Sequence, residues 1–307
     1  MAELARRISI LVNPGSGKRR GAEKLREVTG AASAHPEVTV RKLERHRPLA
    51  DQAQSAVAEG YDIVAAAGGD GTICGIAAAL AKSGQVMGVL PLGTFNYFAR
   101  SLDIPQELGP ALDLLRTGEA RPINVGSVND RLFLNNASLG AYPSILKSRE
   151  EIYSRWGRSR VAAYWSVLVA LCRRSHSIRL RLVADGQEHR FRTPLVFIML
   201  NAYQLRQHEL DGEDIIRRGK FAVFVAPDLT RFGMIRTAIG LATGRLEKAR
   251  DFTLIEAREL LIDTGRPRDL VARDGERETM RGPFRFTLLS DALRVIAPAV
   301  GQTADPA

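Results

Sequence analysis

A glycine-dense turn at residues 68–72 carries the residue types that bind phosphate groups, in the order Gly-Gly-Asp-Gly-Thr. It follows an apolar run at residues 61–67 and precedes helix-forming residues at 73–82. A turn between a strand and a helix points backbone N–H groups and the positive end of the helix dipole at a ligand, and glycine lets an anion approach the main chain. From the local pattern alone, an anion site and a tight turn in which Asp70 only caps the helix are equally good interpretations.

Two more glycine-containing loops follow predicted strands. Residues 13–20 (Asn-Pro-Gly-Ser-Gly-Lys-Arg-Arg) follow a strand at 8–12, and residues 91–100 (PLGTFNYFAR) follow a strand at 86–90. The first loop matches neither the P-loop pattern nor the dinucleotide fingerprint, because each needs a glycine that this loop lacks. Loops at the carboxyl ends of parallel strands converge on one crevice, so we expect all three loops to face the same ligand.

The elements that position these loops alternate between strands and helices in the first part of the chain. The expected strands are residues 8–12, 38–43, 61–67 and 86–90, and the expected helices are 49–59, 73–82 and 103–116. This alternation predicts an α/β domain with a doubly wound, mostly parallel sheet.

From about residue 123 the pattern changes to closely spaced strands separated by turn signals. The expected strands are residues 132–139, 178–183, 195–201, 221–225, 254–262, 284–289 and 293–296. They predict an antiparallel β domain. Asp274-Gly275 falls within it, and that pair alone is more typical of a hairpin turn than of catalysis. Residues 301–307 are expected to form a disordered tail.

The composition is that of a globular protein with a basic surface. The chain has 307 residues, 45% of them hydrophobic, and a formal net charge of +10. The charge favours an anionic partner, and nucleic acid is the weakest choice because the basic residues form no known reading element. Cys74 and Cys172 lack metal-ligand spacing, so we expect reduced thiols in a cytosolic protein. No apolar run reaches the roughly 20 residues of a membrane span.

A segment at about residues 143–175 mixes aromatic and basic residues, among them Trp156, Arg158 and Trp165. Such a mixture suits a membrane interface, where aromatic rings lie at headgroup depth and arginines meet lipid phosphates. A core helix with a solvated basic face fits the pattern somewhat better, because apolar stripes usually pack against a sheet.

The order of the motifs resembles the diacylglycerol kinase catalytic domain family, in its bacterial lipid kinase branch, which is related to the sphingosine kinases. The motifs are Asn13 to Gly17, the GGDGT turn, Gly93 to Asn96 with Ala99-Arg100, Phe133 to Gly140, Asn201, and Asp274-Gly275-Glu276. GGDGT alone is shared with NAD kinases. The resemblance implies an ATP-binding α/β domain at 1–123, joined by a returning segment at about 290–300. It also implies a lipid-binding β-sandwich at 124–289, with ATP and lipid meeting in the cleft between the domains.

The resemblance also implies roles for individual residues. The expected ATP-binding residues are Asn13, Gly15, Gly17, Gly68, Gly69, Asp70, Gly71, Thr72, Gly93, Thr94 and Asn96. Arg19, Arg20 and Arg100 are expected to neutralise phosphate charge. Asp70 is expected to help place Mg²⁺, Asp211 is a further metal candidate, and Asp274 matches the aspartate that accepts the proton of the lipid hydroxyl.

Several acidic positions of the family pattern are replaced here. Tyr97 and Asn124 stand where the family usually has aspartates, Arg217-Arg218-Gly219-Lys220 replaces an acidic metal-linked segment, and Arg273 replaces an apolar residue. The changes leave two interpretations. The arginines substitute for metal charge on phosphate or bind an anionic acceptor, or the protein binds nucleotide or lipid with little turnover.

The sequence therefore predicts an ATP- and Mg²⁺-dependent lipid kinase of lipid metabolism. It would phosphorylate a hydroxyl of a diacylglycerol-like lipid, in the cytoplasm and peripherally at the inner membrane face. A catalytically weak or inactive nucleotide- or lipid-binding regulatory homologue is one alternative, and an NAD kinase is another. A homodimer stays possible, and nucleic acid is not expected as a partner.

Overall fold

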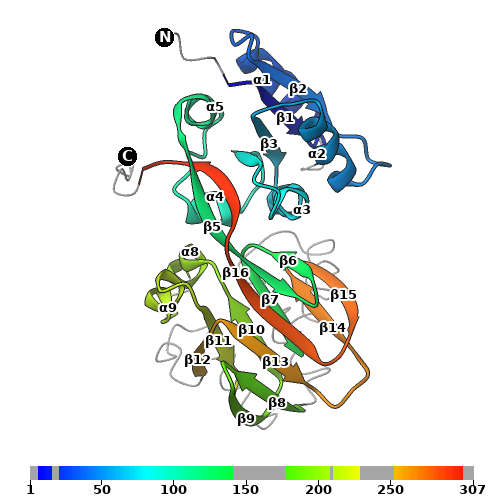
Figure 1. Ribbon diagram of the computed structural model, residues 1–307, viewed down its shortest axis with the longest axis vertical. Helices are drawn as coiled ribbons and strands as arrows, with labels where there is room; N and C mark the ends of the chain where they lie inside the picture. The colour runs from blue at the N-terminus through cyan, green and yellow to red at the C-terminus, as the bar shows by residue number, and fades with distance from the viewer. Residues whose placement is uncertain (1–5, 16–20, 141–176, 208–209, 229–251, 300–307) are drawn as a thin grey trace, which may run out of the picture. The chain divides into compact units, whose positions relative to one another are not determined.

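The computed structural model describes residues 6–15, 21–140, 177–207, 210–228 and 252–299, which divide into two compact units (Figure 1). Unit 1 comprises Met1–Val125 and Leu289–Ala307, and unit 2 comprises Gly126–Leu288. The strands β5 (Glu119–Val128) and β16 (Phe284–Ala297) each contribute residues to both units.

Unit 1 contains a parallel sheet with the strand order β2-β1-β3-β4-β16. Its strands are β1 (Ile8–Val12), β2 (Val38–Lys42), β3 (Ile63–Gly68), β4 (Val86–Pro91) and the carboxyl-terminal part of β16. Every residue of β1 and β3 is buried, as expected for parallel strands covered on both faces. The predicted mostly parallel sheet is confirmed.

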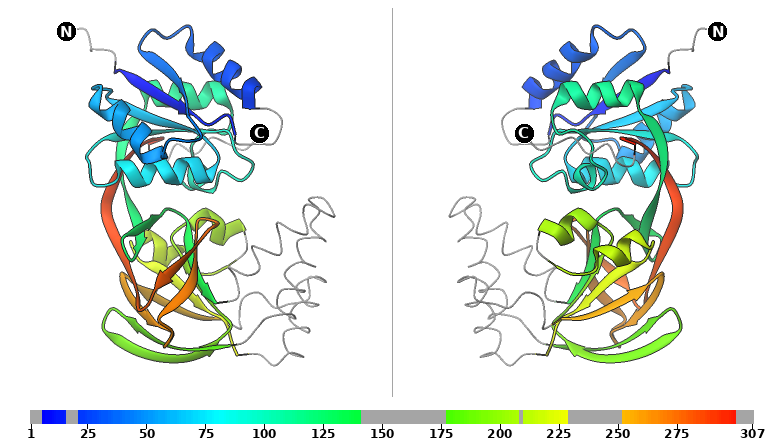
Figure 2. Two further views of the ribbon diagram at one scale, coloured as in Figure 1. Left: turned by 90° about the vertical axis from the view of Figure 1, so that its right-hand side faces the viewer. Right: turned by 90° about the vertical axis from the view of Figure 1, so that its left-hand side faces the viewer.

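Helices cover both faces of this sheet. They are α1 (Gly21–Ala32), α2 (Leu49–Ala58), α3 (Asp70–Leu80), α4 (Tyr97–Ser101) and α5 (Leu108–Thr117). Figure 2 shows α1 beside α5 on one face and α2 beside α3 on the other, and the packing of each pair agrees. Sheet and helices form the doubly wound arrangement that places loops at the carboxyl ends of the strands.

Unit 2 is built from two antiparallel sheets that share one hydrophobic core. One sheet runs β16-β13-β8-β9 and the other β12-β11-β10-β7-β14-β15, while β5 and β6 form a hairpin. The bounds are β6 (Arg131–Phe133), β7 (Asn136–Gly140), β8 (Ile178–Ala184), β9 (Gln187–Thr193), β10 (Leu195–Met199), β11 (Phe221–Val225), β12 (Thr253–Ala257), β13 (Glu259–Asp263), β14 (Arg268–Arg273) and β15 (Glu276–Arg281). Two short helices, α8 (Ala202–Gln207) and α9 (Glu213–Arg217), lie between β10 and β11 in the chain.

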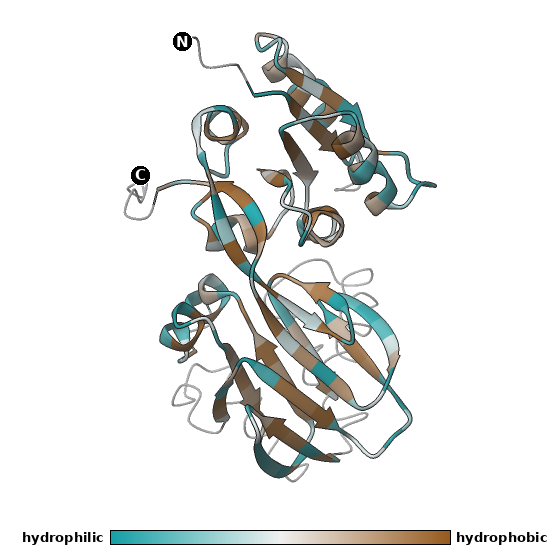
Figure 3. Ribbon diagram, in the orientation of Figure 1, coloured by the Kyte–Doolittle hydropathy of each residue, from teal (hydrophilic) through white to brown (hydrophobic). Residues whose placement is uncertain are grey.

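The core of unit 2 comes from side chains that alternate along these strands. Phe133 stacks on Phe221 with ring centroids 5.8 Å apart and meets the edge of Phe286 at 6.4 Å. Figure 3 shows β10, β11 and β13 as mainly hydrophobic, whereas β9 and β15 are mainly hydrophilic. The predicted antiparallel β-sandwich is confirmed, because the two sheets bury their apolar faces against each other.

Two predicted strands are each divided into two strands in the structure. At each break, backbone N–H groups donate to a carboxylate that is distant in the sequence. Residues 132–139 form β6 and β7, and the break coincides with N–H groups of Leu134 and Asn135 that donate to Asp274. Residues 254–262 form β12 and β13, which belong to different sheets. That break falls at Arg258, whose N–H donates to Asp185.

Two other predicted boundaries also differ from the structure. The expected strands 284–289 and 293–296 are one continuous strand, β16. The helix expected at 103–116 begins only at Leu108, because Asp103 adopts a positive φ of 55° and ends the preceding turn.

The packing around Gly126 leaves no room for a side chain. A Cβ at this position would lie 2.3 Å from Cζ of Phe133, whose ring is buried among other rings and cannot withdraw. We expect Gly126→Ala to destabilise the protein by ~1–3 kcal/mol through overpacking, measured as a lower Tm. Gly30→Ala is the control, because a Cβ at Gly30 in α1 meets nothing within 4 Å. A wild-type Tm for Gly126→Ala would contradict the prediction.

Candidate functional site

Three loops of unit 1 come together at the carboxyl ends of β1, β3 and β4. Asn13 directly follows β1, and its Nδ2 donates to Oγ1 of Thr72 at 2.8 Å. The N–H of Asn13 donates to the carbonyl of Ala67 at 2.9 Å, and its Oδ1 accepts the N–H of Gly15 at 2.8 Å. The first loop is therefore fixed to the turn at residues 68–72.

The loop after β4 joins the same cluster through its main chain. The N–H of Leu92 donates to the carbonyl of Gly68 at 2.9 Å. A Cβ on Gly93 would lie 2.7 Å from the Cα of Gly69, so the two backbones touch. The N–H of Phe98 donates to Oδ1 of Asp70 at 3.3 Å. The structure thus brings together Asn13, Gly68 to Thr72, and Gly93.

The amino terminus of α3 has the features of a phosphate-binding turn. Gly69 is the N-cap and supplies no side-chain cap, and its carbonyl accepts the N–H groups of Thr72 and Ile73. A Cβ on Gly68 would lie 2.7 Å from Thr72, so only glycine fits there. The first N–H groups of a helix lack partners within the helix and carry its positive dipole end. The residues present therefore fit the phosphates of ATP.

The rest of the loop at residues 91–100 is tied down by side chains. Asn96 has a positive φ of 52°, and its Nδ2 donates to the carbonyl of Gly93 at 3.3 Å and to Oε1 of Gln106 at 3.1 Å. Nε of Arg100 donates to the carbonyl of Phe95 at 3.1 Å. Thr94, another predicted site residue of this loop, is exposed.

Asp274 lies at the turn between β14 and β15, in unit 2. Asp274 and Gly275 have positive φ values of 46° and 89°, as in the hairpin turn that the local pattern favoured. Oδ2 accepts the N–H of Leu134 at 2.7 Å, and Oδ1 accepts those of Asn135 and Asn136 at 2.8 and 3.1 Å. Three backbone donors therefore fix the carboxylate in one orientation.

A second turn in unit 2 uses the same device. Asp185 and Gly186 have positive φ values of 45° and 87° between β8 and β9. The carboxylate of Asp185 accepts the N–H groups of Arg258 and Glu259, the shortest contacts being 2.9 Å. An Asp-Gly turn that captures backbone N–H groups is thus a structural element of this fold as well as a candidate catalytic feature.

Tyr97 and Asn124, which replace family acids, and Arg273, which replaces an apolar residue, take part in ordinary contacts. Oδ1 of Asn124 accepts the N–H of Asp291 at 3.1 Å, and the ring of Tyr97 stacks on Phe95 with centroids 5.4 Å apart. Arg273 donates to the carbonyl of Leu132 at 2.7 Å and also pairs with Glu278. Arg273 therefore binds β6, the strand directly before the backbone N–H groups that donate to Asp274.

The basic segment after α9 forms an ion-pair cluster. Arg218 pairs with Asp214 and with Glu256, both at 2.6 Å, and Lys220 pairs with Glu256 at 2.7 Å. Lys220 and then Arg218 hold the pKa of Glu256 below its ordinary value, and Arg218 does the same for the pKa of Asp214. The guanidinium of Arg218 is therefore paired with two carboxylates of unit 2.

Asp70, the first metal candidate, lies in the loop cluster, where its carboxylate accepts the N–H of Phe98. Asp211 lies exposed before α9. Among the residues that the structure describes, no group of three or more His, Cys, Asp or Glu side chains could hold a metal ion. Kinase Mg²⁺ is commonly held by one or two carboxylates together with substrate phosphates, and Asp70 fits such a site.

Several predicted site residues lie outside the described residues. They are Gly17, Arg19, Arg20, Trp156, Arg158 and Trp165, together with Cys172 and the tail at 301–307. Within the described part of the chain, no helix has the length and apolar character needed to span a bilayer.

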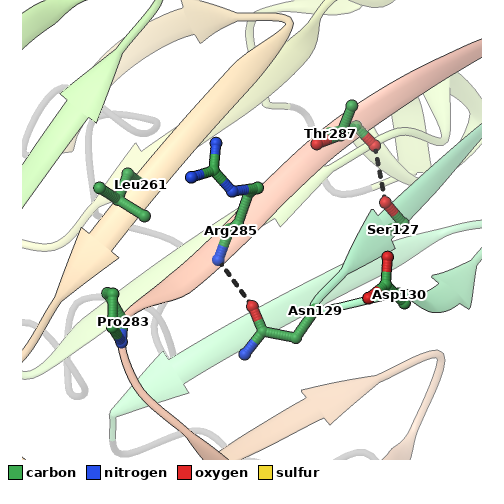
Figure 4. A pocket seen from close by; sticks show the side chains of 7 residues that line it. All are labelled: Ser127, Asn129, Asp130, Leu261, Pro283, Arg285 and Thr287. Carbon is green, nitrogen blue, oxygen red and sulfur yellow. Dashed lines mark hydrogen bonds between the residues drawn. The ribbon is translucent and has the colours of Figure 1, made fainter.

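A pocket of about 290 Å³ opens on unit 2 and includes none of the predicted site residues (Figure 4). It lies at the β5–β6 turn, where Oδ1 of Asn129 accepts the N–H of Arg285 at 2.9 Å and the hydroxyl of Ser127 donates to the carbonyl of Thr287 at 3.3 Å. Its remaining lining residues are Asp130, Leu261 and Pro283.

The two units have the fold shared by diacylglycerol kinases and NAD kinases. A solved structure titled a putative diacylglycerol kinase from Bacillus anthracis str. Sterne matches with a TM-score of 0.72 at 21% identity, covering 96% of this chain and 98% of that one. A yeast NADH kinase complexed with NADH matches with a TM-score of 0.55 at 10% identity, covering 97% and 85%.

The sequence comparisons match part of this chain to one family. Residues 7–128 match the model of the diacylglycerol kinase catalytic domain, and the predicted resemblance to that family is confirmed. A curated protein named diacylglycerol kinase from Staphylococcus aureus (strain bovine RF122 / ET3-1) is 33% identical over 155 residues, or 47% of this chain and 49% of that protein. The match thus spans about half the length of this relative, which is named as a kinase.

Proposed function

We propose that the chain is an ATP-dependent lipid kinase that phosphorylates a hydroxyl group of a diacylglycerol-like lipid. The observation that carries the proposal is the loop cluster of unit 1, where the main chains of Gly69 and Gly93 touch beside the amino terminus of α3. That arrangement leaves room for phosphate at a positive helix end. The oriented carboxylate of Asp274 in unit 2 supplies a candidate proton acceptor.

In the proposed reaction, the lipid hydroxyl loses its proton to the Asp274 carboxylate while its oxygen attacks the terminal phosphorus of ATP and ADP leaves. Backbone N–H groups at residues 69–71 and the hydroxyls of Thr72 and Thr94 would hold the phosphates, and Arg100 would neutralise charge. Asp70 would hold Mg²⁺, which supplies positive charge to the transferring phosphoryl group.

The experiment is to incubate the purified chain with labelled ATP, Mg²⁺ and a total lipid extract. A labelled lipid that depends on both ATP and Mg²⁺ is the expected product, and fractionated lipids then identify the acceptor class. The absence of any labelled lipid would contradict the proposal. A parallel reaction with NAD as acceptor tests the alternative kinase activity that shares the GGDGT turn and this fold.

A regulatory protein without turnover is the second candidate, favoured by Asn124 and Tyr97 in place of acids. It predicts that ATP binds but no lipid is labelled. Lipid labelling well above that of a boiled control would exclude it.

Two arginines make opposite predictions within the proposed function. Arg218→Met should leave kcat and the KM for ATP within about twofold of wild type, because exposed ion pairs like those of Arg218 contribute little. Arg100→Met should raise the KM for ATP, because Arg100 belongs to the loop that faces the phosphates. Steady-state kinetics on both variants makes the comparison. An equal rise in KM for Arg218→Met would contradict the assignment.

We further propose that the protein acts in the cytoplasm at the inner membrane face, because a diacylglycerol-like acceptor resides in a bilayer. The chain's charge of +10 supports contact with anionic lipids. Sedimentation with vesicles containing anionic lipid, compared with neutral vesicles, tests this location.

A further inference from the structure

Four amide side chains form a connected network between β7 and α8. Asn201 Nδ2 donates to Oδ1 of Asn135 at 2.6 Å, and both residues are only 2% exposed. Oδ1 of Asn201 accepts the N–H of Gln204 at 3.0 Å, and Oε1 of Gln204 accepts Nδ2 of Asn136 at 2.9 Å. We call Asn135, Asn136, Asn201 and Gln204 the amide network.

The network holds the same stretch of backbone that binds the Asp274 carboxylate. The N–H groups of Asn135 and Asn136 donate to Oδ1 of Asp274, and the carbonyl of Asn135 accepts the N–H of Leu200 at 2.9 Å. Side chain, N–H and C=O of Asn135 are therefore all engaged. Movement of its side chain would move the donors that orient Asp274.

Buried amides are an expensive way to fill a core. Each must find partners, whereas leucine or valine would fill the same volume without that requirement. A connected polar network restricts the geometry, because a shift of one member leaves a buried donor or acceptor unpaired. The amide network therefore specifies a position for the backbone at residues 134–136 more sharply than apolar packing would.

We propose that the amide network positions Asp274 for phosphoryl transfer, with Asn201 and Gln204 as positioning residues that act through the backbone at 134–136. The inference rests on the proposed lipid kinase function. It gives a positioning role to Gln204, which belongs to no sequence motif and lies 70 residues from Asp274 in the chain.

The test compares two buried polar residues of unit 2. Asn201→Leu should lower kcat by about 10- to 100-fold with little change in the KM for ATP, because a displaced proton acceptor affects the chemical step rather than nucleotide binding. Thr193→Val is the matched control. Thr193 is fully buried, its hydroxyl donates to the carbonyl of Ala226 at 2.6 Å, and it belongs neither to the amide network nor to the backbone at residues 134–136. It should lower Tm but leave kcat unchanged.

Two further measurements separate positioning from general destabilisation. Hydrogen exchange at the amides of Leu134, Asn135 and Asn136 should be faster in Asn201→Leu and unchanged in Thr193→Val. In an Asp274→Asn background, Asn201→Leu should add less than twofold to the loss, because residues that act as a unit are not additive. A full additional loss would overturn the inference.

If Asn201→Leu fails to fold, Gln204→Met removes one acceptor at the edge of the network and should show the same pattern more weakly. Wild-type kcat together with wild-type exchange in these variants would contradict the inference. An inactive wild-type protein would contradict the proposed function instead. The exchange of the three amides would then decide whether the network holds this backbone.

Discussion

Replacing Asp274 by asparagine is expected to lower kcat for lipid phosphorylation by about 10²- to 10⁴-fold, the usual contribution of a positioned general base. The amide cannot take the proton of the lipid hydroxyl. Both carboxylate oxygens of Asp274 accept backbone N–H groups. The NH₂ group of asparagine replaces one of these oxygens and therefore faces backbone donors in either orientation of the amide. Labelled lipid formed per unit time, at saturating ATP, measures the effect.

Asp185→Asn is the matched control for that experiment. Asp185 lies in the same kind of Asp-Gly turn and accepts two backbone N–H groups, those of Arg258 and Glu259, where Asp274 accepts three. The two variants should therefore lose similar stability, measured as Tm. Only Asp274→Asn should lose activity. Equal activity in both variants would reduce Asp274 to a structural residue and remove the proposed proton acceptor.

Gly93→Ala is expected to abolish tight ATP binding. The added methyl group would lie 2.7 Å from the Cα of Gly69 and 2.6 Å from Oδ1 of Asn96, so two loops must separate. A separation on the order of 1 Å is enough to cost about 10²-fold when ligand groups must be held in place. Titration calorimetry with ATP measures the affinity, and the same sample gives Tm.

Gly109→Ala is the control in the same unit. Gly109 lies near the start of α5, a Cβ there meets nothing within 4 Å, and alanine favours a helix. ATP should bind Gly109→Ala as it binds the wild type. Wild-type affinity in Gly93→Ala would show that the contact between the two loops has no part in the nucleotide site.

The sequence was informative where a strand is buried on both faces or alternates strictly. The apolar runs of β1 and β3 and the alternation of β8 placed those strands to within a residue or two. The strands β9 and β15 escaped prediction because they form sheet edges with mostly polar residues. An edge strand facing water carries little hydrophobic signal.

Interactions between distant residues explain the other errors. The breaks after β6 and β12 depend on Asp274, which lies 140 residues from Leu134, and on Asp185, which lies 73 residues from Arg258. No local pattern contains such information. The convergence of Asn13, Gly68 to Thr72 and Gly93 was predictable, because a topological rule for parallel sheets fixes where loops meet. Gln204 was not predictable, since it belongs to no motif.

The continuity of β16 has a consequence for biosynthesis. In the sheet of unit 1, β4 pairs with β3 on one side and with Arg294 and Val295 of β16 on the other. On a ribosome, the edge of β4 therefore stays unpaired until Arg294 and Val295 have been synthesised, and closing this contact requires a loop of about 200 residues. Residues 7–128 expressed alone would expose that edge permanently and should aggregate. The segment that matches the family model is not, in this fold, a segment that can complete its own sheet.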